Sequence, residues 1–545
     1  MGDPVWIVSA TLKAKGFSLS RPPSTYRGPI RIHGNEATVE IEIPDLTFAT
    51  MPKVWLIDSF RLRAEKLVHV NHDGTICYVG EGGLPLDLYD PGGSVLRVLR
   101  EAEIALEGSF GSNAAKEYET ELAFYWNGDY SVYVALPPDE RPRIYHADLL
   151  RIGAADRSLD VVVPTGQWKH TNVQVRRQIT ILSFAEPLRH SAEFASSNLA
   201  GVLEWLSSQR RPPEGLREAI VASAATSDPI FVVSPNALIG WKPTLPANIK
   251  MLQTAGGRRK KFGEMQIQKS LDKIGLERMT GTKSDLRSVV ERNLLGRPSL
   301  IGKRISLIGA GTIGGNLARL LVQSGAGCGE DFTIYDTDVF RPGNLGRHVL
   351  GFVDLRRSKA EALGDFLRDF HPDVQVRPLK RNALDDWDAL QRSDLIIDAT
   401  GDYNVAAALN HLRMKSKSVG NDVAILHAWV FGNGIAAQTF LNLKDGLGCY
   451  RCLRPAFDGP WRYAPVKDVK QQVSLAPAIC GEAGYIPFSA DAPVAAASLA
   501  LLAALDWAAD KPGQRLRTIT LNFDEGKEVR WTSPSRVNGC MACGS

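Results

Sequence analysis

The amino-acid sequence predicts a multidomain α/β protein, with an N-terminal α+β domain (1–137), a middle α/β domain (138–292) and a C-terminal doubly wound domain (293–545). A chain of 545 residues is too long for one hydrophobic core, so several domains are expected. The segment ATVEIEI (37–43) alternates strictly between apolar and polar residues, which predicts a half-buried strand. From about residue 300, strands alternate with helices, which predicts a parallel sheet covered by helices.

The first domain contains three further predicted elements. KVWLID (53–58) reads as a second strand, and the apolar spacing of SVLRVLREAEIAL (94–106) and AAKEYETELAFYW (114–126) predicts two helices. The proline-rich, charged segment LPPDERPR (136–143) then marks a domain boundary.

The middle domain has a mixed pattern and no recognisable chemical motif. Three β-rich runs predict strands, at LDVVVP (159–164), QITILSF (178–184) and PIFVVS (229–234). NLAGVLEWLSSQ (198–209) predicts a helix. A structural role is therefore expected for this segment.

The C-terminal domain has the clearest pattern. Its predicted strands are RISLIG (304–309), FTIYD (332–336) and DLIIDAT (394–400), and its helices are GNLARLLVQSG (315–325) and KAEALGDFLRDF (359–370). The alanine-rich run from Ala492 is too short and too weakly apolar to cross a bilayer, so it predicts a buried helix.

Composition limits the class of partner. The net charge of +4 provides no strong field for a polyanion, so direct nucleic-acid binding is not expected. No targeting segment is visible, and four of the seven cysteines form two C-x-x-C pairs, a metal pattern typical of a reducing compartment. We therefore expect a cytoplasmic protein that does not bind a membrane.

A glycine-rich turn follows the first strand of the C-terminal domain. The motif GAGTIG places Gly309, Gly311 and Gly314 between a strand and a helix. Glycines at this spacing let backbone N–H groups approach a phosphate at the positive end of the helix. Asp336 ends the next strand, 22 residues after Gly314, where an acidic residue commonly binds ribose. The pattern predicts a nucleotide site.

Polar residues after this turn favour ATP chemistry over hydride transfer. Attack on the α-phosphate of ATP needs cations to neutralise developing charge and a carboxylate for Mg²⁺, whereas a dehydrogenase has no use for them. The candidates near the predicted carboxyl edge of the sheet are Asp338, Asn344, Arg347, Lys359 and Asp402.

Two C-x-x-C pairs, with equal separations of 91 residues, predict a structural metal site. Four thiolates can hold Zn²⁺ tetrahedrally and leave no open position for catalysis. The predicted ligands are Cys449, Cys452, Cys540 and Cys543.

Residues 300–545 resemble the ThiF/MoeB superfamily of ubiquitin-activating-type adenylating enzymes, through the glycine turn, the polar residues above and the C-x-x-C pairs. The resemblance implies that the domain binds ATP and Mg²⁺ and joins AMP to the C-terminal carboxylate of a small protein. The family's Asp-x-x-Asp is one residue longer here, so Asp398 and Asp402 both stay candidates for magnesium. Arg292 matches an arginine that relatives extend into a dimer partner's site, which implies a homodimer.

The segment APAICGEAGYIPFSADAPVAAASL, which contains Cys480, resembles the family's crossover segment. In family members that pass their product on, the matching cysteine accepts the acyl group as a thioester. The resemblance therefore implies that Cys480 is the first nucleophile, and a nearby helix N-terminus would favour its thiolate.

The loop HVNHDGTIC resembles the active-site loop of ubiquitin-conjugating enzymes, in which His-Pro-Asn precedes an acceptor cysteine. His69, Asn71, Gly74 and Cys77 match, whereas Val70 replaces the proline and Asn71 lies closer to the cysteine than usual. The resemblance implies that Cys77 accepts the acyl group, with Asn71 either stabilising an oxyanion or bracing the loop.

The domain order resembles bacterial conjugating–activating fusions of CBASS antiphage and related ubiquitin-like conjugation operons, whose middle domain is a degenerate adenylation-like or linker domain. This implies a relay from adenylate to Cys480, Cys77 and an amine-bearing target. The modified tail would belong to a ubiquitin-like protein or to a CD-NTase (cGAS-like nucleotidyltransferase). Two alternatives remain: a sulfur-carrier adenylyltransferase with an inactive N-terminal domain, and a nucleotide-binding scaffold.

Overall fold

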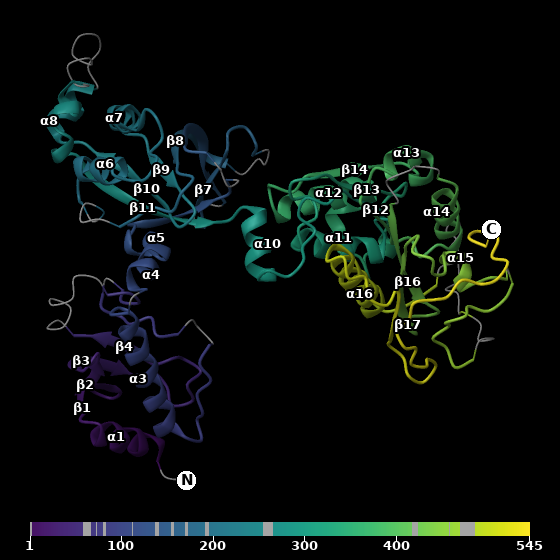
Figure 1. The fold of residues 1–545 in the computed structure, drawn as a ribbon, viewed down its shortest axis with the longest axis horizontal. Coiled ribbons are helices and arrows are strands. Elements are labelled where there is room, and N and C mark those ends of the chain that lie inside the picture. Colours follow the sequence, from purple (N-terminus) through teal and green to yellow (C-terminus); the bar gives the residue numbers. More distant parts are fainter. Residues whose placement is uncertain are drawn as a thin grey trace. The chain divides into compact units, whose positions relative to one another are not determined.

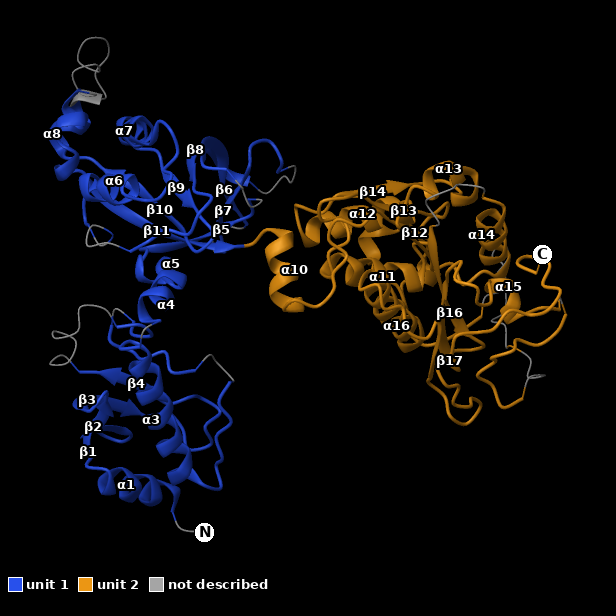
Figure 2. Ribbon diagram, in the orientation of Figure 1, with its two compact units in different colours: residues 1–283 blue, residues 284–545 orange. Residues whose placement is uncertain are grey.

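The computed structural model describes two compact units, residues 1–283 and 284–545 (Figure 2). The described residues are 3–57, 67–71, 73–79, 83–111, 113–136, 141–153, 157–168, 173–190, 194, 196–253, 265–416, 423–456, 458–468, 473 and 486–544.

The first unit begins with a four-stranded antiparallel sheet covered by two helices (Figure 1). Its strands, in spatial order, are β1 (Ser18–Arg21), β2 (Thr25–Ile32), β3 (Asn35–Glu42) and β4 (Lys53–Leu56). Helices α1 (Pro4–Ala14) and α3 (Pro91–Gly108) contribute Leu12 and Val98 to the core that contains Val39 and Ile41. The strands predicted at 37–43 and 53–58 and the helix predicted at 94–106 are confirmed.

One polar residue of β3 departs from the predicted alternation. Glu40 is only 8% exposed, although its position in the pattern predicts a solvent-facing side chain. Arg27 donates two hydrogen bonds to Glu40 Oε1, at 3.0 and 2.8 Å, and Arg21 and Ser20 also bond this carboxylate. Burial raises the pKa of Glu40, but the hydrogen bonds and charges of these partners outweigh it, so the pKa is lowered.

The rest of the first unit is a closed seven-stranded barrel with the order β10-β11-β5-β7-β6-β8-β9. Its interior contains Val132, Ile179, Phe231 and Met279, and an outer core with Trp126 packs against helices. The strands are β5 (Tyr130–Val134), β6 (Arg143–Ile152), β7 (Leu159–Pro164), β8 (Val173–Ser183), β9 (Ile230–Val233), β10 (Leu238–Thr244) and β11 (Gly275–Lys283), and the helices are α4 (Ala114–Thr120), α5 (Leu122–Tyr125), α6 (Leu199–Ser207), α7 (Leu216–Thr226), α8 (Ala247–Gln253) and η2 (Leu271–Lys273).

The barrel differs from two expectations. Its β6 pairs antiparallel with β7 and β8, so this segment is not a doubly wound, adenylation-like sheet. The expected boundary after residue 137 lies beyond β5, which already pairs with β11 and β7 of the barrel. These pairings join residues far apart in the chain, which local periodicity does not report.

The second unit contains the predicted doubly wound sheet, with the strand order β14-β13-β12-β15-β16-β17-β18 (Figure 1). The first five of these strands are parallel, and β17 and β18 extend the sheet beyond β16 with antiparallel pairing. The strands are β12 (Ile305–Ile308), β13 (Phe332–Tyr335), β14 (Val376–Leu379), β15 (Leu395–Asp398), β16 (Ala424–Phe431), β17 (Ala436–Asn442) and β18 (Leu516–Thr520).

Helices cover both faces of this sheet. Leu307 and Ile397 pack in the core formed with α10, α11, α12 and α16, whereas Ile308 and Ile396 pack in the core formed with α13 and α14. The helices are α10 (Leu286–Leu294), α11 (Thr312–Gln323), α12 (Lys359–Phe370), α13 (Trp387–Leu390), α14 (Tyr403–Lys415), α15 (Tyr450–Leu453) and α16 (Asp491–Ala508), with short 3₁₀ turns η3 (Pro342–Asn344), η4 (Phe352–Asp354) and η5 (Ala383–Asp386).

Helix α16 is the apolar run that starts near Ala492. Among the described residues it is the helix whose length and composition fit a membrane span. Its small residues Ala496, Ala500 and Ala503 are buried in the domain core, and it lies beside α11 (Figure 1). The predicted buried helix is therefore confirmed.

The Glu40 cluster predicts an acid-sensitive contribution to the stability of the first unit. Because the folded-state pKa is lowered, the stabilisation is present above the ordinary glutamate pKa, about 4, and is lost as the pH falls through the folded-state value. Glu40→Gln should lower the free energy of unfolding at pH 7 by about 1–3 kcal/mol, as measured by urea denaturation. The difference from wild type should shrink in acid, and the exposed Glu36→Gln serves as the control.

Candidate adenylation and thioester sites

The glycine turn lies where the direction of strand order reverses. Strand β12 pairs with β13 on one side and β15 on the other, so a crevice opens beyond its carboxyl end. Gly309 has φ +90°, and a Cβ there would lie 3.1 Å from the backbone nitrogen of Thr400. A Cβ on Gly314 would lie 1.8 Å from the carbonyl oxygen of Gly309, so no other residue fits. Around Gly311, no atom lies within 4 Å of an added Cβ, which leaves room for a ligand.

Asp336 braces this turn from the end of β13. Its carboxylate accepts hydrogen bonds from the backbone N–H groups of Ala310 and Asp338, each at 2.7 Å. Burial raises the pKa of Asp336 despite these bonds. The acidic residue predicted for ribose is thus beside the glycine turn.

Lys359 opens α12, as predicted, and is 8% exposed. Its Nζ lies 2.8 Å from Asp338 Oδ2, and its backbone N–H donates to the carbonyl oxygen of Asp338 at 3.0 Å. The carboxylate of Asp338 is well exposed, so the buried ammonium is held at the edge of the crevice by a partner that solvent reaches.

Arg347 reaches the segment that follows Cys480. Its guanidinium carbon lies 4.5 Å from the centre of the Phe488 ring, and Nη1 donates to the carbonyl oxygen of Ile486 at 3.4 Å. Asn344, three residues earlier, accepts a hydrogen bond from Arg341 N–H and shapes the turn. Cys480 itself lies outside the described residues.

His348 ties the arginine turn to the glycine turn. Its Nε2–H donates to the carbonyl oxygen of Ala310 at 2.8 Å, and its Nδ1 accepts from Leu350 N–H at 3.1 Å, which assigns one neutral tautomer. Burial lowers the pKa of His348 and favours this neutral ring. His348 was not predicted from the sequence, although its position directly after Arg347 could have marked it as a site residue.

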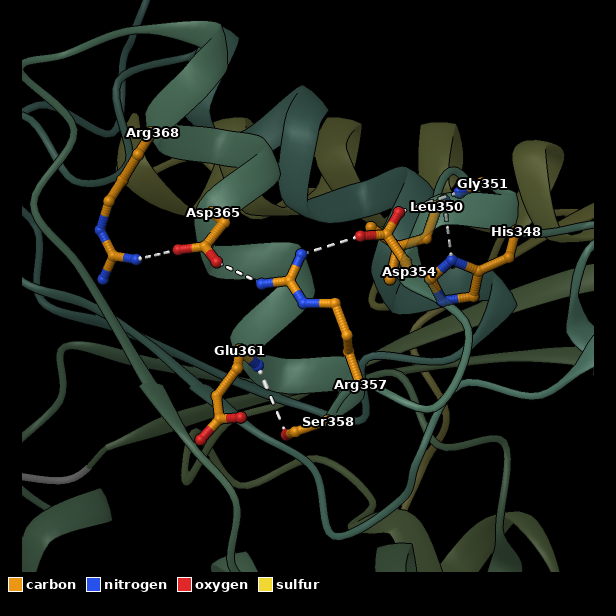
Figure 3. Close-up of polar contacts among 9 residues, drawn as sticks. All are labelled: His348, Leu350, Gly351, Asp354, Arg357, Ser358, Glu361, Asp365 and Arg368. Carbon is orange, nitrogen blue, oxygen red and sulfur yellow. Dashed lines mark hydrogen bonds and ion pairs between the residues drawn. The ribbon is translucent and has the colours of Figure 1, made fainter. Parts of the chain in front are cut away.

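The chain between His348 and α12 is held by a small polar network (Figure 3). Asp354 accepts from Gly351 N–H at 3.1 Å and from Arg357 at 2.9 Å. Arg357 also bonds Asp365 of α12, and Ser358 caps this helix through Glu361 N–H. The network fixes the start of α12, and with it Lys359.

The two aspartates at the end of β15 differ in environment. Asp398 is 2% exposed, and its Oδ2 lies 2.9 Å from His427 Nδ1 of the neighbouring strand. Its Oδ1 accepts from the backbone N–H and hydroxyl of Thr400. Asp402 is exposed, and its Oδ1 caps α14 through the N–H groups of Asn404 and Val405. The exposure of Asp402 and the burial of Asp398 favour Asp402 as the magnesium ligand. The partner of Asp398, His427, was not predicted from the sequence.

The four predicted metal ligands lie together. The sulfur atoms of Cys449, Cys452, Cys540 and Cys543 all lie within 4.8 Å of one another, and three pairs are 3.5–4.0 Å apart. A tetrahedral Zn–S distance of about 2.3 Å requires sulfurs about 3.8 Å apart, so the cluster fits Zn²⁺. Asn410 Nδ2 lies 3.8 Å from Cys449 Sγ and can donate to a thiolate.

In the first unit, the HVNHDGTIC loop folds as a short hairpin. Val70 and Ile76 form an antiparallel bridge and are buried, and Cys77 N–H donates to the carbonyl oxygen of His69 at 2.8 Å. Cys77 is exposed. Asn71 N–H donates to Thr75 O, and its buried Oδ1 accepts no hydrogen bond from the described residues.

The structure therefore brings the nucleotide residues together at one edge of the second unit's sheet and presents Cys77 on the first unit. Arg292 lies in the last turn of α10 and is exposed. Its predicted role in a dimer stays a prediction.

Two family models match the chain. The ThiF family model matches residues 292–536, and the Prokaryotic E2 family B model matches residues 7–134. The second match ends at the last residue of β5.

Three relatives extend this comparison. The ATP-dependent ubiquitin transferase-like protein Cap2 of Pseudomonas aeruginosa (strain BWHPSA011 / Pa011) is 27% identical over 99% of this chain and 98% of its own. A protein of the same name from Escherichia coli (strain TW11681) is 36% identical over 32% of this chain and 30% of its own. The SAMP-activating enzyme E1 of Haloferax volcanii is 27% identical over 46% of this chain and 83% of its own.

Both family matches coincide with the parts that carry the predicted chemistry, and the Cap2 similarity runs through the barrel between them. The chain is thus an adenylating enzyme of the ubiquitin-activating and ubiquitin-conjugating type, in which a prokaryotic E2 family B domain and a ThiF-family domain are joined in one polypeptide.

Proposed function

We propose that this enzyme activates the C-terminus of a partner protein with ATP and passes it through Cys480 and Cys77 to an amine. The observation that carries the proposal is an open glycine turn bonded to Asp336 and to His348, the neighbour of Arg347, in a chain that also presents an exposed Cys77 on an E2-type domain. A sulfur-carrier adenylyltransferase would have no use for that second domain.

In the first step, the partner's C-terminal carboxylate attacks the α-phosphorus of ATP, and pyrophosphate leaves. The N–H groups of the glycine turn bind phosphate oxygens, and Asp336 binds the ribose once nucleotide replaces its present contacts. Arg347 and Lys359 offset the negative charge that grows on the α-phosphate. Asp402 would hold Mg²⁺, which neutralises phosphate charge when bound.

In the next steps, the Cys480 thiolate attacks the carbonyl carbon of the acyl adenylate and AMP leaves. Cys77 then takes the acyl group by thioester exchange, which releases the Cys480 thiolate. A thioester retains enough acyl-transfer potential for attack by a target amine, which yields an amide and regenerates the Cys77 thiol.

The partner we propose is a protein with an extended C-terminal tail, either ubiquitin-like or a nucleotidyltransferase. The similarity to Cap2 proteins, named as ubiquitin transferase-like, supports this class. We further propose a role in bacterial antiphage defence, which loss of phage protection on deleting the gene from its native operon would test.

Zinc binding should be structural. We expect one Zn²⁺ per chain by elemental analysis of protein purified without added metal, because the four sulfurs have tetrahedral spacing. Cys449→Ser should lose the metal and lower the melting temperature of the second unit, since ligand geometry and folding are coupled. The buried Cys328→Ser, outside the cluster, should retain zinc. A metal-free wild type of full stability would contradict the site.

Arg347→Ala and Lys359→Ala should each slow ATP–pyrophosphate exchange by about 100-fold, because these contacts strengthen as charge grows in the transition state. Nucleotide affinity, measured by calorimetry, should change far less. Arg319→Ala, a substitution on α11, serves as the matched control and should exchange at the wild-type rate. Wild-type exchange by both test variants would remove the two residues from the mechanism.

Alanine variants of the two cysteines should give different thioester adducts on non-reducing gels with partner, ATP and Mg²⁺. Cys480→Ala should still exchange pyrophosphate but leave Cys77 uncharged, because the first acceptor is missing. Cys77→Ala should accumulate a reducible adduct on Cys480 and release no amide. Normal conjugation by Cys77→Ala would show that Cys77 is a packed thiol and not an acceptor.

A further inference from the structure

Three polar contacts join His69, Tyr125 and Glu121 in a closed ring, and His69 lies across the hairpin from Cys77. The backbone N–H of His69 donates to the Tyr125 hydroxyl at 2.9 Å, and that hydroxyl donates to Glu121 Oε2 at 3.1 Å. Glu121 Oε1 in turn lies 3.7 Å from His69 Nδ1, the separation of an ion pair and not of a direct hydrogen bond. Glu121 and Tyr125 come from the chain around α5, more than 50 residues after His69.

The ring holds a residue whose backbone is unfavourable by itself. His69 has φ +62°, a left-handed conformation that is unfavourable for a residue with a side chain. The Tyr125 hydroxyl accepts the hydrogen bond from His69 N–H. Tyr125 is fixed by stacking on Tyr118, with ring centres 4.1 Å apart.

The same turn places His69 beside the acceptor. Cys77 N–H donates to His69 O at 2.8 Å, so the backbones of the two residues face each other across the hairpin. The side chains of His69 and Glu121 are 30% and 41% exposed, and Cys77 is exposed. A target amine in solvent can therefore reach both side chains.

The carboxylate determines what this imidazole can do. A carboxylate facing Nδ1 favours a proton on that nitrogen, which leaves the Nε2 lone pair free to accept one. The ionisable groups in contact with the His69 ring of contacts are Glu121, Tyr125 and Tyr118, and the Cys77 N–H bonds His69 across the hairpin. The His69 imidazole has two ring nitrogens, so it can be held at Nδ1 while Nε2 accepts and returns a proton.

We propose that His69 is the general base for attack of an amine on the Cys77 thioester, and that Glu121 and Tyr125 are positioning residues that hold it. The inference rests on the last step of the proposed function.

The step balances without a further reactant. A neutral amine attacks the thioester carbonyl carbon, and Nε2 of His69 takes one proton from the nitrogen as the C–N bond forms. The C–S bond then breaks with its electron pair on sulfur. The imidazolium returns the proton to the thiolate, so the products are an amide and the Cys77 thiol.

The test bypasses adenylation. In full-length Cys480→Ala protein, Cys77 is loaded by exchange with a short diglycyl benzyl thioester, and lysine is then added. Intact-protein mass spectrometry follows both loading and loss of the acyl group. Loading should change less than twofold in His69→Gln and Glu121→Gln, whereas aminolysis should fall about 100-fold in the first and about 10-fold in the second.

Further variants separate chemistry from folding. Glu121→Asp, which keeps the charge, should recover part of the rate, and Tyr125→Phe, which keeps the ring stack, should slow aminolysis without reducing the melting temperature by more than a few degrees. The exposed Glu117→Gln on α4 is the matched control.

Wild-type aminolysis by folded His69→Gln would overturn the general base, and wild-type aminolysis by Glu121→Gln would overturn its positioning role. Equal losses of loading and aminolysis would show a purely structural ring. If the unmodified chain forms no ATP-dependent thioester with a partner while the chemically loaded protein still transfers, the proposed relay fails and the role of His69 stands.

Discussion

The organisation of the adenylation site depends on the peptide groups on either side of Ala310. The N–H of Ala310 donates to Asp336, and its carbonyl oxygen accepts from His348. Gly314 permits this arrangement, because a side chain there would overlap the carbonyl oxygen of Gly309. One turn thus joins Asp336, the start of α11 and the turn that contains Arg347.

From that turn, rigidity extends to the charged residues. His348 accepts from Leu350 N–H, and the next residue, Gly351, donates to Asp354 (Figure 3). Asp354 belongs to the network that holds the start of α12 and therefore Lys359. Preorganised charges stabilise a transition state without reorganising during the reaction. The buried Lys359 is consistent with this principle.

In the E2-type domain, too, side chains from distant segments hold a turn in place. There the strained turn at His69 is held by Tyr125 and Glu121, from helical segments next to the barrel. The segment that supplies these two side chains also packs in the core beside the barrel, so it contacts both the Cys77 loop and the barrel within the first unit.

The sequence by itself determined what depends on short-range spacing: the glycine turn, Asp336, the two C-x-x-C pairs and, in the second unit, β12, β13, β15, α11, α12 and α16. Such features follow from periodicity or motif spacing along one segment. Tertiary structure alone decided the barrel closure, the burial of Glu40 and the partners of His348, Asp398 and Glu121. Each depends on strand pairing or side-chain contact between segments far apart in the chain, and a single sequence contains no local signal for such contacts.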